Sequence, residues 1–141
     1  MYNEFKGGVT MQLSKFSDYS FRALIYLAKH TDQLCTVEEL ATALNTSEHH
    51  MKKVIHQLAK TEYITSIKGR GGGLKLSKNP SDINLGEVLK MTEDHMNLIE
   101  CFNHSQSCPL LSSGCKLKRI ASKALHQFIH EFSQHTLDDL L

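Results

Sequence analysis

The sequence contains no apolar run that approaches the roughly 18 to 20 residues needed to cross a bilayer, which excludes a membrane-spanning helix. It also lacks the basic, apolar and small-residue pattern of a secretory signal at its N-terminus. No strong excess of one charge marks the chain as a whole, because the formal net charge is only +1 over 141 residues. We therefore expect a cytoplasmic protein of one domain, or of one domain with an added oligomerisation element, and no membrane association.

Features of an enzyme are also missing. The chain has no glycine-rich nucleotide loop, no evident acid–base pair and little length from which to build a substrate cleft. An enzyme that uses a cysteine–metal site is therefore disfavoured, and we expect a protein without catalytic activity.

The charge that is present gathers in the middle of the chain. Residues 45–78 hold seven lysine and arginine residues against only Glu48 and Glu62, whereas the flanking stretches 1–44 and 79–141 are both net negative. A local excess of this kind is typical of a phosphate-binding face. An ordinary solvated surface would explain the charge alone equally well.

Residues 1–10 show no periodicity and look foreign to the rest of the chain. In a bacterial gene, Lys6, Gly7 and Gly8 can be encoded by a ribosome-binding sequence that lies a short spacer upstream of the codon for Met11. We therefore hypothesise that Met11 is the biological start and that residues 1–10 are a translated leader.

Helical patterns dominate the next part of the chain. Apolar residues recur at helical spacing over residues 14–30, and Thr36 with Glu39 forms a capping-box pattern that opens a short second helix. Ser47 is the expected N-cap of a third helix, with an apolar stripe of Met51, Val54, Ile55 and Leu58. Two helices joined by so short a turn, the second with a polar outer face, are typical of a helix-turn-helix.

The period then changes to that of two short strands, at residues 63–67 and 74–76, separated by glycines that can adopt the positive φ angles of a hairpin turn. We interpret this hairpin as a wing. Arg70 at its tip could enter a narrow minor groove, and the third helix could enter a major groove. The expected DNA-contacting residues are Ser47, His49, His50, Lys52, Lys53, Lys68, Arg70, Gly71 and Gly72.

A further helix is expected from Asn84 to about Thr92, followed by a cysteine-bearing loop. The last long helix starts near Cys115 and carries apolar residues over almost five turns: Leu117, Ile120, Ala121, Ala124, Leu125, Phe128, Ile129 and Phe132. A terminal helix of a small domain has more apolar surface of this kind than the domain can cover, so we expect it to pair with a second copy of the chain.

Three cysteines, Cys101, Cys108 and Cys115, are spaced C-x6-C-x6-C. Clustered cysteines in a cytoplasmic protein more often bind metals than form disulfides. Zinc sites prefer ligands two to four residues apart, so the wider spacing argues against simple structural zinc, although a zinc-stabilised DNA-binding protein remains an alternative. A fourth ligand is needed, and His104 is one candidate. Cys35 stands alone and is interpreted as a buried apolar residue.

These motifs resemble those of a family of bacterial winged-helix regulators that includes NsrR, IscR and CymR, over essentially the whole of residues 11–141. The sequence is most similar to the nitric-oxide-responsive NsrR branch. The similar segments are Met-Gln-Leu-Ser at residues 11–14, Ser-Asp-Tyr at 17–19, Arg-Gly-Gly-Gly-Leu at 70–74, Ile-Asn-Leu-Gly-Glu-Val at 83–88, Thr-Glu-Asp at 92–94, Glu-Cys-Phe at 100–102 and His-Thr-Leu-Asp-Asp-Leu at 135–140.

The resemblance implies an iron–sulfur cluster held by the three cysteines. In the IscR branch a histidine stands three residues after the last cysteine, where this chain has Lys118; the NsrR branch implies instead an aspartate near the N-terminus, given by the partner subunit, which matches Asp18. Asp18 could otherwise be a first-turn helix carboxylate paired with Arg22.

Taken together, the residues and the resemblance predict a mainly α protein with a small β-hairpin. The expected organisation is a leader at residues 1–10, a winged helix-turn-helix DNA-binding region at 11–80, a helix and cluster-binding loop at 81–114, and a dimerisation helix with a closing segment at 115–141.

The predicted function is that of a homodimeric repressor that binds double-stranded operator DNA and responds to nitric oxide through a [4Fe-4S] cluster. The alternative is an iron–sulfur homeostasis or redox regulator with a [2Fe-2S] cluster.

Overall fold

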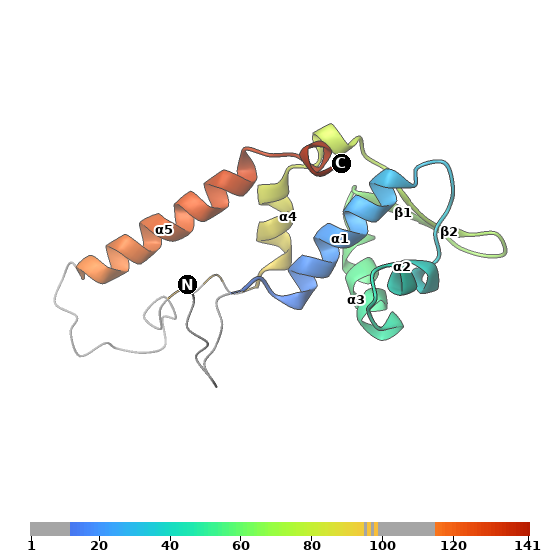
Figure 1. The fold of residues 1–141 in the computed structure, drawn as a ribbon, viewed down its shortest axis with the longest axis horizontal. Coiled ribbons are helices and arrows are strands. Elements are labelled where there is room, and N and C mark those ends of the chain that lie inside the picture. Colours follow the sequence, from blue (N-terminus) through green and yellow to red (C-terminus); the bar gives the residue numbers. More distant parts are fainter. Residues whose placement is uncertain (1–11, 95, 97, 99–114) are drawn as a thin grey trace.

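The computed structural model describes residues 12–94, 96, 98 and 115–141. In these residues the chain is mainly helical with one β-hairpin, as the sequence predicts (Figure 1). The predicted leader lies outside the described residues, as do Cys101 and Cys108. The elements in chain order are α1 (Lys15–Lys29), α2 (Val37–Ala43), α3 (Glu48–Leu58), β1 (Ile64–Ile67), β2 (Gly73–Leu76), the 3-10 turn η1 (Pro80–Asp82), α4 (Leu85–Thr92), α5 (Lys116–Ser133) and the 3-10 turn η3 (Leu137–Leu140).

Side-chain caps start the helices where the sequence predicts them. Thr36 and Glu39 form the reciprocal capping box of α2, in which each side chain accepts a hydrogen bond from the backbone N–H of the other residue. The Ser47 hydroxyl accepts from the His50 N–H at the start of α3. Asn45, with φ of 51°, makes the tight turn between α2 and α3. The turn at Asn45 and the cap at Ser47 end one helix and start the next within a few residues.

The core lies around α1, which packs against both α3 and α4. The predicted inward stripe of α3 is confirmed, because all four of its residues are buried. Each buried aliphatic side chain contributes on the order of 1.5–3 kcal/mol to folding. The largest fully buried apolar side chains are Leu24, Leu27, Leu40, Met51, Leu58, Ile83, Leu89 and Leu137.

The hairpin is anchored to the helices through Cys35. Strands β1 and β2 pair antiparallel, with Ile64 opposite Leu76 and Ile67 opposite Gly73. Leu74 of β2 exchanges two backbone hydrogen bonds with Cys35, at 3.0 and 2.8 Å. Cys35 is 3% exposed, which confirms its interpretation as a buried residue, and its pKa is raised by that burial first and by Glu39 second.

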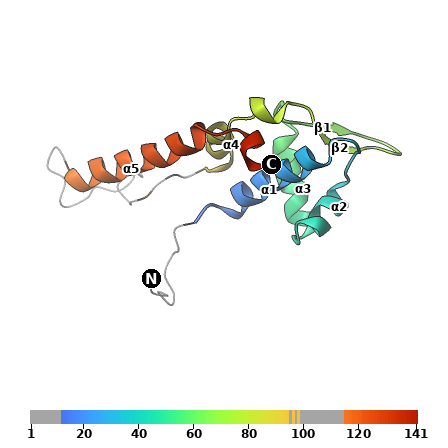
Figure 2. The same ribbon diagram turned by 45° about the horizontal axis from the view of Figure 1, so that its top comes forward.

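Helix α5 leaves the rest of the molecule as an arm, which Figures 1 and 2 both show from different sides. It contacts the body near its C-terminal end, where Phe132 packs against Phe21 with ring centroids 5.8 Å apart. The Asn84 amide donates to the Ser133 carbonyl at 2.8 Å, and the closing turn η3 buries Leu137 completely. Among the described residues, no helix is both long and apolar enough to cross a membrane.

Candidate nucleic-acid interface and metal centre

The outer face of α3 presents the residues that were expected to contact DNA. Ser47, His49, His50, Lys52 and Lys53 are all exposed, because the buried stripe turns their side chains away from the core. Lys52 forms an ion pair with Glu48 one turn earlier, with 2.7 Å between Nζ and Oε1. In the part of the chain that the structure describes, Lys53 has no such pair. Lys53 is therefore the more available cation of the two.

The wing tip is shaped by its glycines. Gly69 and Gly71 have φ angles of 98° and 74°, which other residues rarely adopt, and the Gly72 N–H closes the turn by donating to the Gly69 carbonyl at 3.0 Å. A side chain on Gly72 would collide with the carbonyl oxygen of Ile67. Gly72 is therefore required for closing the hairpin, whether or not it contacts DNA.

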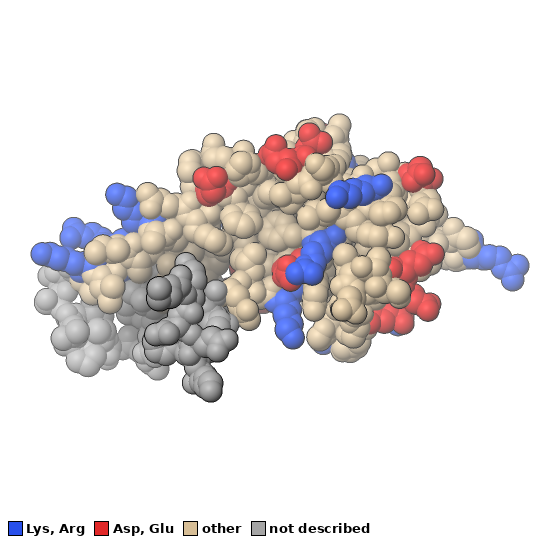
Figure 3. All heavy atoms as spheres, viewed as in Figure 1, with Lys and Arg blue, Asp and Glu red and all other residues tan. Residues whose placement is uncertain are grey.

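The cations of the wing lie at the far end of the molecule from α5. Figure 3 shows lysine or arginine side chains where Figure 1 places the tip of the hairpin, and Lys68 and Arg70 are both exposed. The tip is thin because its two central glycines carry no side chains. A thin loop with projecting cations suits entry into a narrow groove.

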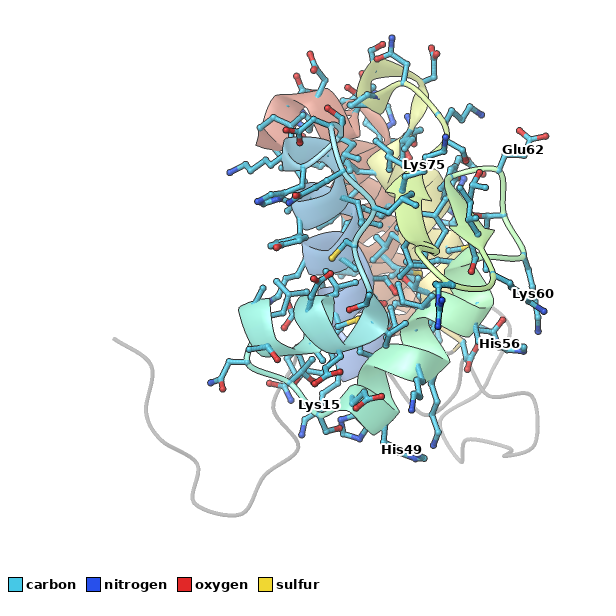
Figure 4. The ribbon with its side chains drawn as sticks, turned by 90° about the vertical axis from the view of Figure 1, so that its right-hand side faces the viewer. Lys15, His49, His56, Lys60, Glu62 and Lys75 are labelled. Carbon is cyan, nitrogen blue, oxygen red and sulfur yellow. The ribbon has the colours of Figure 1, made fainter. Side chains whose placement is uncertain are left out.

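A hollow of about 640 Å³ lies beside the outer face of α3, between that helix, the start of α1 and the end of α4. It includes His56 and Gln57, which the sequence analysis did not identify. The signal for His56 was available, since residues 49, 52, 53 and 56 follow one helical face. Figure 4 shows the side chains of His49 and His56 projecting outward from α3. The lining residues are Phe16, His49, Lys52, Lys53, His56, Gln57, Met91 and Asp94.

Asp18 lies in the first turn of α1, where its carboxylate accepts a hydrogen bond from Arg22. The Arg22 Nε and Asp18 Oδ1 atoms are 2.9 Å apart, and 44% of the Asp18 side chain remains exposed. The predicted pairing with Arg22 is therefore confirmed. Among the described residues, no hydrogen bond is made to the second carboxylate oxygen of Asp18.

Of the three predicted cysteine ligands, only Cys115 lies in the described residues. It is the N-cap of α5, is partly exposed, and its side chain makes no capping hydrogen bond. Thiolates are suited to iron, whereas a carboxylate such as that of Asp18 is a harder and weaker ligand. Within the described residues, no three His, Cys, Asp or Glu side chains lie close enough together to hold a metal ion.

The residues after Cys115 fit an anionic group. Lys116, Lys118 and Arg119 follow it directly and are all exposed, and Figure 3 shows cations gathered at this end of α5. Cations at the N-terminus of a helix oppose the helix dipole, so this placement is unfavourable by itself. A cluster with thiolate ligands is anionic and would offset both the dipole and the side-chain charges. The local chemistry therefore fits such a group.

Comparison with known proteins identifies the family. Residues 13–141 match the Rrf2 family, which is described as "Iron-dependent Transcriptional regulator". The chain belongs to the Rrf2 family. Its relatives include proteins named HTH-type transcriptional regulator NsrR: the one from Halalkalibacterium halodurans is 45% identical over 93% of this chain and 90% of the relative. The one from Bacillus subtilis is 38% identical, with the same two coverages.

Solved structures share the Rrf2 fold at lower identity. The IscR of T. potens superposes with a TM-score of 0.74 at 21% identity and covers 92% of this chain and 85% of its own. CymR, the global cysteine regulator of B. subtilis, superposes with a TM-score of 0.70 at 22% identity and covers 93% and 96%. These likenesses confirm the predicted winged helix-turn-helix architecture.

Membership of the Rrf2 family confirms three of the sequence predictions. The protein is a DNA-binding transcriptional regulator, it is not an enzyme, and it belongs to a group of regulators that depend on iron. The exposed faces of α3 and the wing are accordingly the candidate nucleic-acid interface.

Proposed function

We propose that this Rrf2 protein is a homodimeric repressor that holds an iron–sulfur cluster and releases its operator when nitric oxide attacks that cluster. The carrying observation is the identity of 45% with a regulator named NsrR, over 93% of this chain. The resemblance to the NsrR branch implies nitric oxide as the signal. Lys118, three residues after the last cysteine, supports this branch over the IscR branch because a charged lysine does not ligate iron.

Operator binding would use α3 in a major groove and the wing in the neighbouring minor groove. The outer face of α3 offers Lys53 as a cation for a guanine edge or a phosphate, and His49 and His50 as donors or acceptors. Arg70, which is exposed at the wing tip, would enter the minor groove. A dimer would present two copies of α3 and the wing to the two half-sites of a palindromic operator.

Helix α5 would hold the two subunits together. Leu117, Ile120 and Phe128 are 62%, 68% and 44% exposed. Among the described residues, Phe132 and Ser133 near the C-terminal end of α5 contact the body of the domain. A large apolar surface of this kind is favourable only when it is covered. An antiparallel or parallel partner helix would cover it at little cost, because the 18 residues of α5 provide a straight surface.

The cluster would be held by Cys101, Cys108 and Cys115, and by Asp18 of the partner subunit. When bound, it supplies the chemistry that reacts with nitric oxide. Asp18 would supply one weak, exchangeable ligand, because a carboxylate oxygen is a harder donor than a thiolate, and a weak ligand suits a site that reacts with a small diatomic molecule. The Arg22 hydrogen bond would orient the carboxylate so that its free oxygen faces outward. We expect a [4Fe-4S] cluster rather than a [2Fe-2S] cluster.

The decisive experiment is anaerobic purification followed by absorption spectroscopy and operator binding. We expect broad visible bands, operator binding by the coloured protein, and loss of both on titration with nitric oxide. Alanine at any of Cys101, Cys108 or Cys115 should abolish the bands, whereas Cys35→Ala should keep them, because Cys35 is buried in the core.

Two outcomes would contradict the proposal. A colourless protein that contains zinc would be a DNA-binding protein without this sensing role. A protein whose spectrum and iron content indicate a [2Fe-2S] cluster, and whose operator binding resists nitric oxide, would be an iron–sulfur homeostasis or redox regulator instead.

A further inference from the structure

A chain of hydroxyl groups joins the start of α1 to the last turn of α4. The Ser14 hydroxyl donates to the Ser17 hydroxyl at 3.2 Å, and Ser17 donates to the Thr92 hydroxyl at 2.7 Å. Thr92 in turn donates to the carbonyl of Val88 at 2.9 Å, within its own helix. The chain thus connects residues 75 positions apart in the sequence.

A second hydrogen bond runs parallel to this chain. The Ser14 backbone N–H donates to the Glu93 carboxylate at 2.7 Å. The carboxylate satisfies an N–H at the very start of α1, and it lies in the residue that directly follows α4. The N-terminus of α1 and the C-terminus of α4 are therefore held together at two neighbouring points.

The buried position of these hydroxyls calls for an explanation beyond packing. Ser17 and Thr92 are 0% and 2% exposed, and a buried hydroxyl is costly unless it is hydrogen-bonded. An alanine and a valine would fill a similar volume without that requirement. A hydrogen bond weakens steeply as its distance and angle depart from their optimum, so it favours one relative position of the two helices more strongly than an apolar contact does.

The link lies between the cysteine-bearing segment and the helix proposed to read DNA. On the α4 side, Cys101 follows Glu93 by eight residues in the sequence. On the α1 side, the ring of Tyr19 lies 6.4 Å from that of His50 on the outer face of α3, and Phe16 lines the same hollow as His49. The first two turns of α1 are therefore in contact with the helix that reads DNA, and the same turns carry Asp18.

We propose that the Ser17–Thr92 hydrogen bond, supported by Ser14–Glu93, is the positioning link through which the cysteine-bearing segment sets the position of α3. This inference rests on the proposed cluster-dependent function and assigns residues to its regulation. The link would carry a change at the end of α4, the helix that the cysteine-bearing segment follows in the sequence, to the start of α1 and so to α3. Neither Ser17 nor Thr92 needs to touch the cluster or the DNA.

The test compares three variants of the full-length protein. Thr92→Val removes the acceptor of Ser17 with little change of volume, and Ser17→Ala removes the donor. Ser20→Ala is a matched control, because Ser20 is equally buried on the same helix but donates only to the Phe16 carbonyl of its own helix. For each variant, cluster content is measured by absorption and iron analysis, and operator affinity is measured with and without the cluster.

We expect Thr92→Val and Ser17→Ala to bind the cluster as wild type does, while the ratio of the two operator affinities falls about fivefold or more, the scale of a typical allosteric coupling. Ser20→Ala should keep the wild-type ratio. In the double variant Ser17→Ala with Thr92→Val, the ratio of operator affinities should fall no further than in either single variant, because both substitutions break the same hydrogen bond. In the cluster-free protein, NMR resonances of His50 should shift in Thr92→Val but not in Ser20→Ala.

Unchanged ratios in Thr92→Val and Ser17→Ala, with only lower melting temperatures, would overturn the link and leave the proposed function standing. If wild type itself shows no difference in affinity between its two forms, the proposed function and the link both fail. If a variant at Ser17 or Thr92 does not fold, Glu93→Ala removes the acceptor of the Ser14 N–H at a less buried position. An unchanged ratio of operator affinities in Glu93→Ala would count equally against the link.

Discussion

Gly86 of α4 lies directly against Ser133 of α5, so close that a Cβ atom on Gly86 would lie 2.8 Å from the Ser133 Cα and would overlap its hydroxyl. The two helices meet backbone to backbone here, which is possible only without a side chain on α4. This is also the point from which α5 extends as an arm (Figure 1). Gly86 therefore permits the close approach of α4 and α5 at the base of the proposed dimerisation helix.

Gly86→Ala should destabilise the protein by about 1–3 kcal/mol, because the added methyl group forces α4 and α5 apart. Urea unfolding followed by circular dichroism would measure this. Lys90→Ala, on the exposed side of the same helix, should change stability by no more than about 0.5 kcal/mol. A stability equal to wild type in Gly86→Ala would mean that the two helices can separate freely.

Lys53→Ala and Arg70→Ala should each weaken operator binding by about 1–3 kcal/mol if the side chain contacts a base edge. If it contacts only phosphate, affinity should fall on all sequences and the salt dependence should become less steep. Fluorescence anisotropy at several salt concentrations separates these cases. Lys29→Ala is the control, because Lys29 is exposed at the C-terminal end of α1, away from the end that contacts α3. Wild-type affinity in the Lys53 and Arg70 double variant would rule out this docking geometry.

Leu125→Asp with Phe128→Asp should convert the dimer into a monomer. Two unpaired carboxylates buried in an interface between two α5 helices would weaken dimerisation by several kcal/mol. Sedimentation velocity at micromolar concentration measures the result, and circular dichroism checks that the domain stays folded. A matched change at Lys123, Lys123→Asp, should leave the dimer intact because this residue is exposed and charged already. A dimer that survives the double substitution would place the interface elsewhere.

Asp18→Ala should leave a cluster on three thiolates that is lost more quickly in air, and should relax repression without nitric oxide. The half-life of the visible absorption measures the first effect, and operator affinity the second. Arg22→Ala keeps the carboxylate but removes the hydrogen bond that would orient it, so its effect should be smaller than that of Asp18→Ala. If Asp18→Ala retains the wild-type spectrum, nitric-oxide sensitivity and affinity, His104 or an external ligand becomes the better candidate.

The junction between α5 and η3 should respond to pH through His135. Its imidazole lies 3.1 Å from Glu131 and 3.4 Å from Asp139, and its pKa is raised, chiefly by the hydrogen bond to Glu131 and further by Asp139. A raised folded pKa means that this stabilisation is complete below the unfolded value near 6.5 and disappears as the pH rises through the folded value.

His135→Gln should therefore lower the melting temperature more at about pH 5.5 than at about pH 8.5, by the linkage between protonation and folding. Thermal unfolding at both pH values measures the difference. Comparison with wild type removes the contribution of the other histidines. An equal effect of the substitution at both pH values would show that the two carboxylates do not stabilise the charged ring.

Local signals in the sequence were enough to predict the helices, the wing and their caps. Thr36 with Glu39, and Ser47, start helices through hydrogen bonds to residues three positions away, so their effect does not depend on the rest of the fold. The inward stripe of α3 follows from helical periodicity alone. The family could also be predicted, because its motifs are short and contiguous in the chain.

Contacts between distant segments were decided only by the tertiary structure. The bond between Ser17 and Thr92, the close approach of Gly86 to Ser133 and the pairing of Cys35 with Leu74 each join residues far apart in the chain. No periodicity or cap encodes them, because each depends on how whole helices pack against one another. The sequence by itself determined the family, the helices and the wing, and it predicted which residues could read DNA and bind iron. How one end of α1 meets both α3 and α4 depends on the packed core, where burial makes a hydrogen bond between distant hydroxyls necessary.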